Sequence, residues 1–169
     1  PEILSQWAFP LLRYRRLMTC RRPPHSVLLM SEAKWERQMS TEANKQTVMK
    51  FFEAGNRGDM DTCFGLIADD ITWTNMGTTS LSGTYAGKAE LMEKLLGPLF
   101  GQLKQGIHMD VVRMVAEGDH VVAQTEGSAE TLDGKPYNNS YCWIIRLRDG
   151  QFVELTEFLD TELVTSVFG

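Results

Sequence analysis

The sequence predicts one α+β domain over residues 40–169, with a cone-shaped, curved antiparallel sheet wrapped around about three N-terminal helices. Apolar residues first recur at helical spacing, within residues 40–100. Long alternating segments follow, and Gly- and Asp-containing breaks typical of hairpins separate them. Helices followed by a meander of strands are the order expected of an α+β fold.

Three helices are expected before the long strands. The first begins with Ser40 as a plausible N-cap and ends at residues 55–58, which contain two glycines. Asp59 can cap a second, short helix. The third helix runs over about 87–100, and Pro98 should weaken its last turn.

Five strands are expected, one before the third helix and four after it. The four later strands are separated by short breaks that contain Asp and Gly, which tolerate the positive φ of tight antiparallel turns. The expected strands are 71–75, 107–116, 119–131, 137–148 and 151–162.

The charge distribution separates the first forty residues from the rest. The formal charge is −5, yet residues 1–40 carry seven Lys or Arg against three Glu, which leaves ten basic and nineteen acidic residues beyond them. An acidic body does not suit nucleic acid, whose phosphates bind basic surfaces. No run reaches the ~20 apolar residues of a membrane span. Neither nucleic acid nor a membrane is therefore an expected partner.

The three cysteines indicate neither a disulfide framework nor a zinc site. Cys20, Cys63 and Cys142 are odd in number, far apart and free of any Cys-x-x-Cys spacing. This pattern favours a reducing compartment, so a cytoplasmic location is expected. His108 and His120 show no metal-ligand spacing, and we expect neither a metal nor an organic cofactor.

Residues 1–39 are expected to form a poorly ordered basic extension. The Arg-rich stretch 13–24 has no helical or strand period that survives its prolines. Three interpretations stay open: sequence translated upstream of the natural start, a loosely docked arm, or a remnant of a mitochondrial targeting segment. Met39 resembles a natural beginning. No function is inferred from this region.

The last expected strand carries the main candidate for chemistry. By the period of two, Glu157 shares a face with Leu155 and other apolar side chains. Burial without a countercharge raises the pKa of a carboxyl group, so Glu157 can act as a general acid or base near neutrality. The alternative is that Glu157 lies at the rim of the pocket, or pairs with Arg146, and does no chemistry.

The hairpin turn sets the expected neighbours of this strand. If Asp149-Gly150 forms a two-residue turn, Cys142 lies opposite Glu157 and Ile144 lies opposite Leu155. Ile144 and Leu155 are then expected to line the pocket.

Several stretches together resemble the SnoaL-like branch of the nuclear-transport-factor-2-like superfamily. The resemblance covers roughly residues 41–168. This branch is similar to polyketide cyclases, ketosteroid isomerases and limonene-epoxide hydrolases. The resemblance implies a cone-shaped fold, an apolar cavity and a dimer formed through the sheet. The stretches are Asn-Arg-Gly-Asp (56–59), Ile-Thr-Trp (71–73), Ser-Gly-Thr-Tyr-Ala-Gly-Lys-Ala-Glu-Leu (82–91), Asp-Gly-Lys-Pro-Tyr-Asn-Asn (133–139) and Arg-Asp-Gly-Gln-Phe-Val-Glu-Leu-Thr-Glu-Phe-Leu-Asp-Thr (148–161).

The resemblance to the epoxide hydrolases assigns roles to four residues. Glu157 aligns with their water-activating carboxylate, and Asp160 matches the final Asp of the same stretch, here interpreted as structural or as a helix cap. Trp73 and Asn75 match an aromatic-x-Asn pair that holds the attacking water. Trp73 alternatively fills core volume, and Asn75 alternatively forms a turn.

Gln124 and Glu126 fall where those hydrolases have an Arg-x-Asp pair. The missing Arg puts epoxide hydrolysis by that mechanism in doubt. A two-residue turn at Asp133-Gly134 sends Glu126 to the face away from the pocket. We favour a three-residue turn, which pairs Glu126 with Cys142 and places Glu126 and Glu157 in one cavity.

The resemblance to ketosteroid isomerases does not extend to their catalytic Asp, because residues 74–77 contain no acid. Steroid isomerisation by that mechanism is therefore not expected. His108 is a further candidate for the pocket wall, and Tyr85 and Tyr141 are candidates for its mouth.

Together these observations predict a small-molecule enzyme that acts on a hydrophobic, oxygen-bearing substrate. Its reaction is hydration or hydrolysis, isomerisation, or cyclisation. Glu157 transfers the proton, and Asn75, Gln124 and Glu126 position water or a carbonyl. The alternative is a non-catalytic ligand-binding or interaction module. A homodimer through the sheet is expected, because the strand with Phe152 and Phe158 is too apolar for a free surface.

Overall fold

The computed structural model describes residues 25–169, with side chains from residue 40 onward. The chain divides into two compact units, residues 1–34 and 35–169. In the first unit, the described residues 25–34 are helical. Most of the extension predicted over residues 1–39 lies outside the described residues, and its disorder stays a prediction.

Helix α1 (His25–Asn56) begins earlier than predicted. Ser40 lies inside this helix and does not cap it. The physical reason is local, because no Pro or Gly follows Pro24 until Gly55, so nothing interrupts the helix at Ser40. Helix α1 ends as predicted, and Gly58 adopts a φ of 72° in the turn that follows.

The short second helix, α2 (Met60–Gly65), is capped as predicted. The side chain of Asp59 accepts a hydrogen bond from the backbone N–H of Thr62 at 3.1 Å. The third predicted helix is one continuous helical stretch of three parts, α3 (Lys88–Leu91), a π-turn (Met92–Leu96) and α4 (Gly97–Phe100). The π-turn immediately precedes Pro98, which has no N–H for a regular helical bond.

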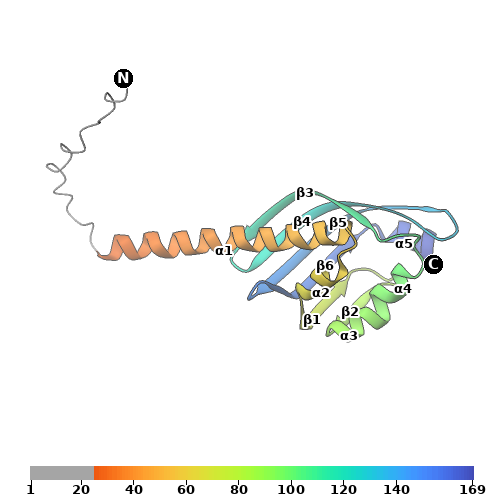
Figure 1. Cartoon of the computed structure of the whole chain (residues 1–169), viewed down its shortest axis with the longest axis horizontal. Coiled ribbons are helices and arrows are strands. Elements are labelled where there is room, and N and C mark those ends of the chain that lie inside the picture. Colours follow the sequence, from red (N-terminus) through yellow and green to blue (C-terminus); the bar gives the residue numbers. More distant parts are fainter. Residues whose placement is uncertain (1–24) are drawn as a thin grey trace, which may run out of the picture. The chain divides into compact units, whose positions relative to one another are not determined.

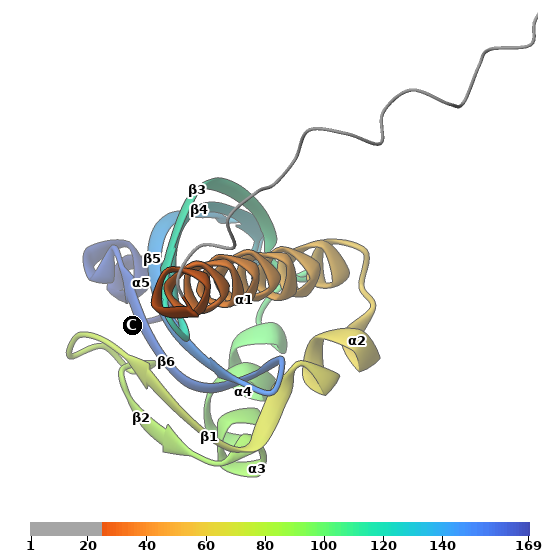
Figure 2. The same cartoon turned by 90° about the vertical axis from the view of Figure 1, so that its left-hand side faces the viewer.

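The sheet has six strands in the order β2-β1-β6-β5-β4-β3. Their bounds are β1 (Ile67–Asn75), β2 (Gly83–Ala86), β3 (His108–Glu117), β4 (His120–Glu130), β5 (Pro136–Arg148) and β6 (Gln151–Leu159). The α+β class and the curved, open sheet agree with the prediction (Figures 1 and 2). The short strand β2 was not among the predicted strands.

One strand pair is parallel, although the sequence predicted an antiparallel sheet. Strand β1 runs parallel to β6, and all other neighbours are antiparallel. Strands β1 and β6 are far apart in the chain, so no hairpin fixes their direction. This pair places Asn75 beside Glu157.

The β5–β6 hairpin begins in the predicted register and then changes it. The turn has positive φ at Asp149 (53°) and Gly150 (74°), and Arg148 pairs with Gln151. A β-bulge lies a few residues further on, where Leu147 pairs with Phe152 but Arg146 pairs with Glu154. The extra residue is Val153, and one extra residue shifts the register of the rest of the ladder.

This bulge overturns two predicted pairs. Glu157 lies opposite Trp143 rather than Cys142, and Leu155 lies opposite Ile145 rather than Ile144. The odd-numbered residues of β5 from 137 to 147 are buried, and the even-numbered ones are exposed or half-buried. The inner face of β5 therefore carries aromatic residues that the predicted register turned outward.

Helices α1 and α3 pack against the inner face of the sheet. Phe52 of α1 contacts Trp143 edge to face, with ring centroids 5.4 Å apart. Leu91 and Leu95 of the third helical stretch belong to the same buried cluster as Trp143. The final helix α5 (Thr161–Phe168) follows β6, and Asp160 caps it by accepting bonds from two backbone N–H groups at 3.0 and 3.1 Å.

Candidate functional site

An apolar cavity of about 110 Å³ lies between the inner face of the sheet and the helices. A single water needs only about 10–15 Å³ measured in this way, so the cavity has room for a small organic group. Most of its wall is aromatic or aliphatic. The lining residues are Phe51, Phe52, Gly55, Asn56, Met60, Cys63, Phe64, Ile67, Trp73, Asn75, Leu81, Leu95, Leu96, Leu99, Phe100, Ile107, Met109, Tyr137, Tyr141, Trp143, Glu157, Leu159 and Val164.

Among the described residues that line this wall, Glu157 is the only one of the types Asp, Glu, Lys, Arg and His. Its side chain is 7% exposed, and burial raises the pKa of its carboxyl group to about 7. The indole Nε1 of Trp73 donates a hydrogen bond to Oε2 at 3.3 Å, which favours the ionised form but acts more weakly than the burial. Glu157 therefore changes its charge near neutral pH.

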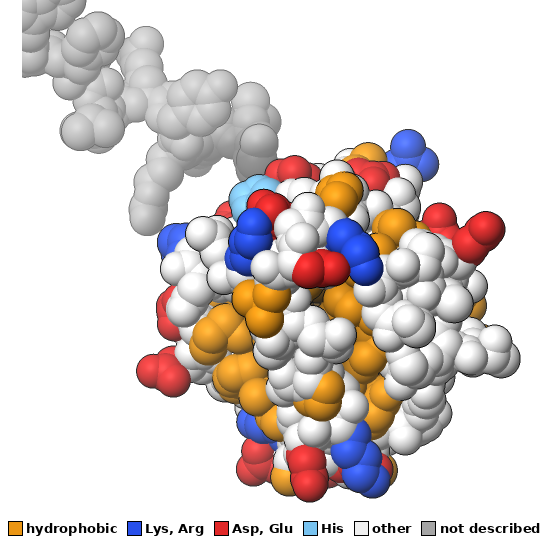
Figure 3. Space-filling view, turned by 90° about the vertical axis from the view of Figure 1, so that its right-hand side faces the viewer, with side chains coloured by type: hydrophobic (Ala, Val, Ile, Leu, Met, Phe, Trp, Pro, Cys, Tyr) orange, Lys and Arg blue, Asp and Glu red, His pale blue; other side chains and the backbone are white. Residues whose placement is uncertain are grey.

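No cation lies near Glu157 in the cavity wall. Arg146, the alternative partner considered for Glu157, instead pairs with Glu154 at 3.0 Å. Arg148 pairs with Asp70 at 2.8 Å, on exposed side chains. On the face shown in Figure 3, charged side chains lie mainly toward the edges and hydrophobic ones gather between them. The described ion pairs are thus surface features, and they leave Glu157 without a countercharge.

Asn75 lies beside Glu157 and has unused hydrogen-bonding capacity. The two residues are direct neighbours in the β1–β6 pair, and both line the cavity. Asn75 is 7% exposed, and its Oδ1 has no hydrogen-bond partner within residues 40–169. Oδ1 can only accept a hydrogen bond, and its burial without a partner is costly, so a ligand hydroxyl that donates to Oδ1 at this point is favourable.

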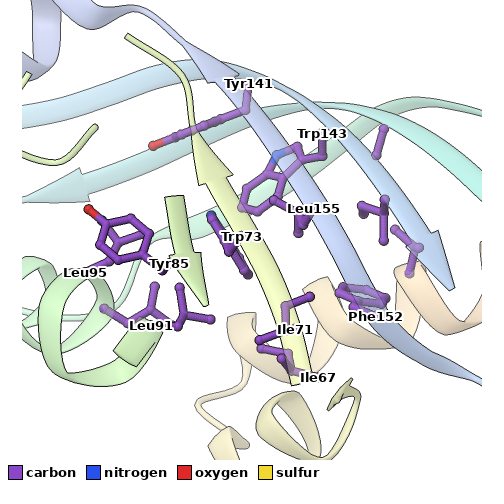
Figure 4. Packing of buried hydrophobic residues seen from close by; sticks show 14 of the residues in the cluster. Ile67, Ile71, Trp73, Tyr85, Leu91, Leu95, Tyr141, Trp143, Phe152 and Leu155 are labelled. Carbon is purple, nitrogen blue, oxygen red and sulfur yellow. The ribbon is translucent and has the colours of Figure 1, made fainter. Parts of the chain in front are cut away.

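Two indole rings form the wall around Glu157. Trp73 of β1 and Trp143 of β5 lie edge to face with centroids 5.6 Å apart (Figure 4). Trp143 donates its Nε1–H to Thr125 at 2.9 Å. Each indole N–H thus has a partner, which fixes both rings beside the carboxyl group.

A pair of tyrosines, Tyr137 and Tyr141, completes the polar part of the wall. Tyr141 donates its hydroxyl hydrogen to Tyr137 at 3.3 Å, and Nδ2 of Asn139 also donates to Tyr137 at 3.3 Å. Burial raises the pKa of both phenols, so they stay neutral. Within the described part of the chain the hydroxyl hydrogen of Tyr137 has no acceptor, so an oxygen atom of a ligand can accept it.

From the sequence, Tyr141 was expected only at the pocket mouth, and Tyr137 and Trp143 were not expected at the site. All three lie at odd positions of one alternating strand, so the period of two contained the signal. The wrong register assigned that face to the outside.

Three predicted site residues lie on the opposite, outer face of the sheet. Glu126 is exposed, pairs with Ser140 in the ladder and accepts a hydrogen bond from its hydroxyl at 2.7 Å. Gln124 is exposed, and Ile144 is 38% exposed. The prediction that Glu126 and Glu157 share one cavity is therefore wrong.

The error arose at the β5–β6 bulge, which places the even-numbered residues of β5 on the face opposite Glu157, and not at the β4–β5 turn. Residues 131–135 form a five-residue loop, and Thr131 organises it by accepting the Lys135 N–H at 2.9 Å on its hydroxyl oxygen. Neither the two-residue nor the three-residue turn considered for this hairpin is present. The three-residue turn correctly placed Glu126 on the same face of the sheet as Cys142. That face, however, is the outer one and does not line the cavity.

Three further predicted residues lie near the cavity without lining it. Tyr85 is buried and donates its hydroxyl to the Leu81 carbonyl at 3.1 Å. Leu155 is fully buried in the core. His108 is exposed and lies 3.4 Å from Asp110, at an outer recess described below. Of the ten residues that the sequence placed at the site, the cavity wall contains four, namely Trp73, Asn75, Tyr141 and Glu157.

The described residues contain no group of three His, Cys, Asp or Glu side chains placed to hold a metal ion. Among the same residues, no helix is long and apolar enough to cross a membrane.

Helices packed on a curved, open sheet around an apolar cavity define the nuclear-transport-factor-2-like α+β fold. Residues 48–155 match the model of the SnoaL-like domain, and the chain belongs to this family. The family includes isomerases and cyclases. No curated protein matches the chain.

Solved structures share this fold at low sequence identity. Bal32a, from a soil-derived mobile gene cassette, is 20% identical with a TM-score of 0.69, over 77% of this chain and 99% of its own. A nuclear-transport-factor-2-like protein from Burkholderia thailandensis E264 is 24% identical with a TM-score of 0.65, over 75% and 97%. TerC, co-crystallised with polyporic acid, is 21% identical with a TM-score of 0.64, over 74% and 97%.

Proposed function

We propose that the protein is a small-molecule enzyme in which Glu157 transfers a proton to and from a hydrophobic, oxygen-bearing substrate. The observation that carries this proposal is the position of Glu157, which is buried in an apolar cavity without a countercharge and has a pKa of about 7. A group with such a pKa is present in both protonation states at neutral pH, which suits a general acid or base.

Asn75 is the proposed partner of Glu157. Its amide has no partner in the described part of the chain and lies next to the carboxyl group. In the proposed step, the Glu157 carboxylate takes a proton from a carbon beside a carbonyl group, and the amide N–H of Asn75 donates to the carbonyl oxygen as negative charge develops there. The protonated Glu157 then returns the proton at another position.

A single carboxyl group favours some reactions over others. Glu126 lies outside the cavity, so the pocket lacks the second acid that the sequence analysis expected. Isomerisation and cyclisation need one group that takes a proton and returns it, and they fit this site better than epoxide hydrolysis. Polyporic acid, the molecule co-crystallised with TerC, supports an oxygen-bearing ring compound as the kind of ligand this fold accepts.

The test is turnover of a panel of enones, lactones and epoxides by wild type, Glu157→Gln and Glu126→Gln. We expect Glu157→Gln to lower turnover about 10²–10⁴-fold, the usual contribution of a general acid or base. Glu126→Gln removes the same charge from the outer face and should leave turnover unchanged. Equal turnover in all three proteins overturns the proposal. No turnover at all, together with a molecule recovered unchanged from purified protein, supports the alternative of a ligand-binding module.

A further inference from the structure

A wider recess of about 560 Å³, here called the vestibule, adjoins the cavity. Five residues line both spaces, namely Gly55, Asn56, Met60, Phe100 and Ile107. The vestibule is further lined by Arg57, Gly58, Gln105, Gly106 and His108. It therefore lies between the turn after α1 and the loop before β3.

A pair of hydrogen bonds lies at the boundary between the two spaces. Asn56 donates its Nδ2–H to the Met109 carbonyl at 2.8 Å, and its Oδ1 accepts from the Met109 N–H at 2.7 Å. This bidentate contact ties the end of α1 to the start of β3. Both ends of the Asn56 amide are occupied, so the residue lies in the shared wall of the two spaces and does not itself bind a ligand.

The vestibule differs from the cavity in its chemistry. Its wall contains Arg57 and His108 but no acidic residue. The backbone N–H groups of Gln105, Gly106 and Ile107 have no acceptor within residues 40–169. Hydrogen-bond donors and positive charge thus gather at the outer end of a pocket whose inner end is apolar.

Two acids lie close to Arg57 and His108 without lining the vestibule. Glu53 lies 4.0 Å from Arg57, and both side chains are 60% exposed. Asp110 lies 3.4 Å from His108. A contact as long as 4.0 Å between exposed groups holds a guanidinium weakly, so Arg57 is free to bind another anion.

We propose that the vestibule binds the anionic end, such as a carboxylate, of an amphiphilic ligand whose apolar body lies in the inner cavity. Arg57 supplies the charge, because a guanidinium matches a planar carboxylate with two N–H groups. The free N–H groups of the 105–107 loop add donors. This inference rests on the proposed function only in placing the reacting part of the ligand beside Glu157.

The test compares two fluorescent probes that differ by one charged group. Anilinonaphthalene sulfonate is anionic, and phenylnaphthylamine is the same molecule without the sulfonate. Fluorescence titration gives the Kd of each probe for wild type and three variants. Arg57→Gln removes the proposed cation. Gly106→Asp adds a carboxylate at a position where an added Cβ meets no atom within 4 Å. Arg113→Gln removes an equal charge from the outer face.

We expect Arg57→Gln and Gly106→Asp each to weaken the sulfonate probe about five- to tenfold, as expected for one charge-assisted contact. The uncharged probe should bind all four proteins equally, and Arg113→Gln should bind both probes like wild type. An equal loss in Arg57→Gln and Arg113→Gln, or no loss in Arg57→Gln, overturns the inference.

The probes also separate this inference from the proposed function. Glu157→Gln should change the Kd of both probes by the same factor, because Glu157 lines the cavity that holds their shared apolar body, whereas the sulfonate lies in the vestibule. Retained turnover in Glu157→Gln, combined with the expected probe results, would overturn the proton-transfer role and leave the anion site standing.

Discussion

The indole Nε1 of Trp73 donates a hydrogen bond to Oε2 of Glu157 at 3.3 Å, inside a cavity wall without a cation. This bond opposes the effect of burial, which raises the pKa of Glu157 to about 7. Trp73→Phe removes the bond to the carboxylate while keeping an aromatic ring. The pKa of Glu157 should therefore rise above the wild-type value.

The pH dependence of turnover measures this change. If the carboxylate is the base, wild-type activity should increase with pH around a midpoint near 7. The midpoint of Trp73→Phe should lie at higher pH. A carboxyl signal followed by isotope-edited infrared titration gives the same pKa without substrate. An unchanged midpoint in Trp73→Phe would show that the indole does not stabilise the charge.

The raised pKa of Glu157 also predicts how folding stability depends on pH. The ordinary pKa of the group is 4.5, and the folded value is about 7. Below the unfolded value both states are protonated, so the full stability is present. Between the two values the unfolded chain loses its proton and the folded one keeps it, so stability falls as pH rises. The loss is on the order of 3 kcal/mol above the folded pKa.

Glu157→Gln tests this dependence, because glutamine does not ionise. We expect its free energy of unfolding in urea to match wild type near pH 5 and to exceed it by on the order of 2–3 kcal/mol at pH 8. Glu126→Gln serves as the control on the outer face. If the difference in the free energy of unfolding between Glu157→Gln and wild type is the same at pH 8 as at pH 5, the carboxyl group of Glu157 is not buried without a countercharge.

Asn75→Leu replaces the unpartnered buried amide with an apolar side chain of similar volume. Because Oδ1 of Asn75 has no partner in the described part of the chain, its removal should raise the free energy of unfolding by about 1 kcal/mol. Turnover should fall by tenfold or more, since the amide is the proposed contact to the substrate oxygen.

Asn139→Leu is the matched control for the amide. Asn139 exchanges two hydrogen bonds with the backbone of Asp160, at 2.9 and 3.2 Å, and donates to Tyr137. Its replacement should lower the free energy of unfolding by about 1–3 kcal/mol. Chemical denaturation of both variants gives the comparison, and a loss of stability in both would mean that Asn75 has a partner after all.

A homodimer through the sheet is still proposed, but the residues that support it are now those of the outer face of the sheet. Phe152, one of the two residues that motivated it, is fully buried in the core. The outer face still exposes Phe158 at 41% and Val115 at 57%, together with Ile144. Phe158→Glu should convert a dimer into a monomer, as measured by light scattering at micromolar concentration. A monomeric wild type under the same conditions contradicts the proposal.

Local signals in the sequence were sufficient for most of the fold. The cap at Asp59, the turn at Asp149-Gly150 and the cap at Asp160 each depend on the chemistry of one or two residues, and all three are present. The start of α1 was wrong because a good capping residue, Ser40, lies within a sequence that nothing interrupts. The strand β2 has four residues and too short a pattern to detect.

The predictions for the candidate site were likewise right where they depended on one strand and wrong where they depended on the register between strands. Glu157 was found from alternation within a single strand, which burial determines directly, and Trp73 and Asn75 from the resemblance to the aromatic-x-Asn pair of the epoxide hydrolases. Glu126 and Ile144 were misplaced because their positions depend on the register between strands. The bulge at Val153 changed that register and moved both residues to the outer face, and a bulge has no signature that period-two reasoning detects.

The bulge at Val153 determines which face of β6 lines the pocket. If Val153 paired with Arg146 in a regular ladder, the remainder of β6 would turn over, so Thr156 and Phe158 would point inward and Glu157 would point to solvent. A protein of this fold can thus keep or lose a carboxyl group in its cavity according to whether one extra residue, at a distance from the pocket, is taken up in a bulge. Aligned sequences of such proteins are best compared by strand parity before their acidic residues are equated.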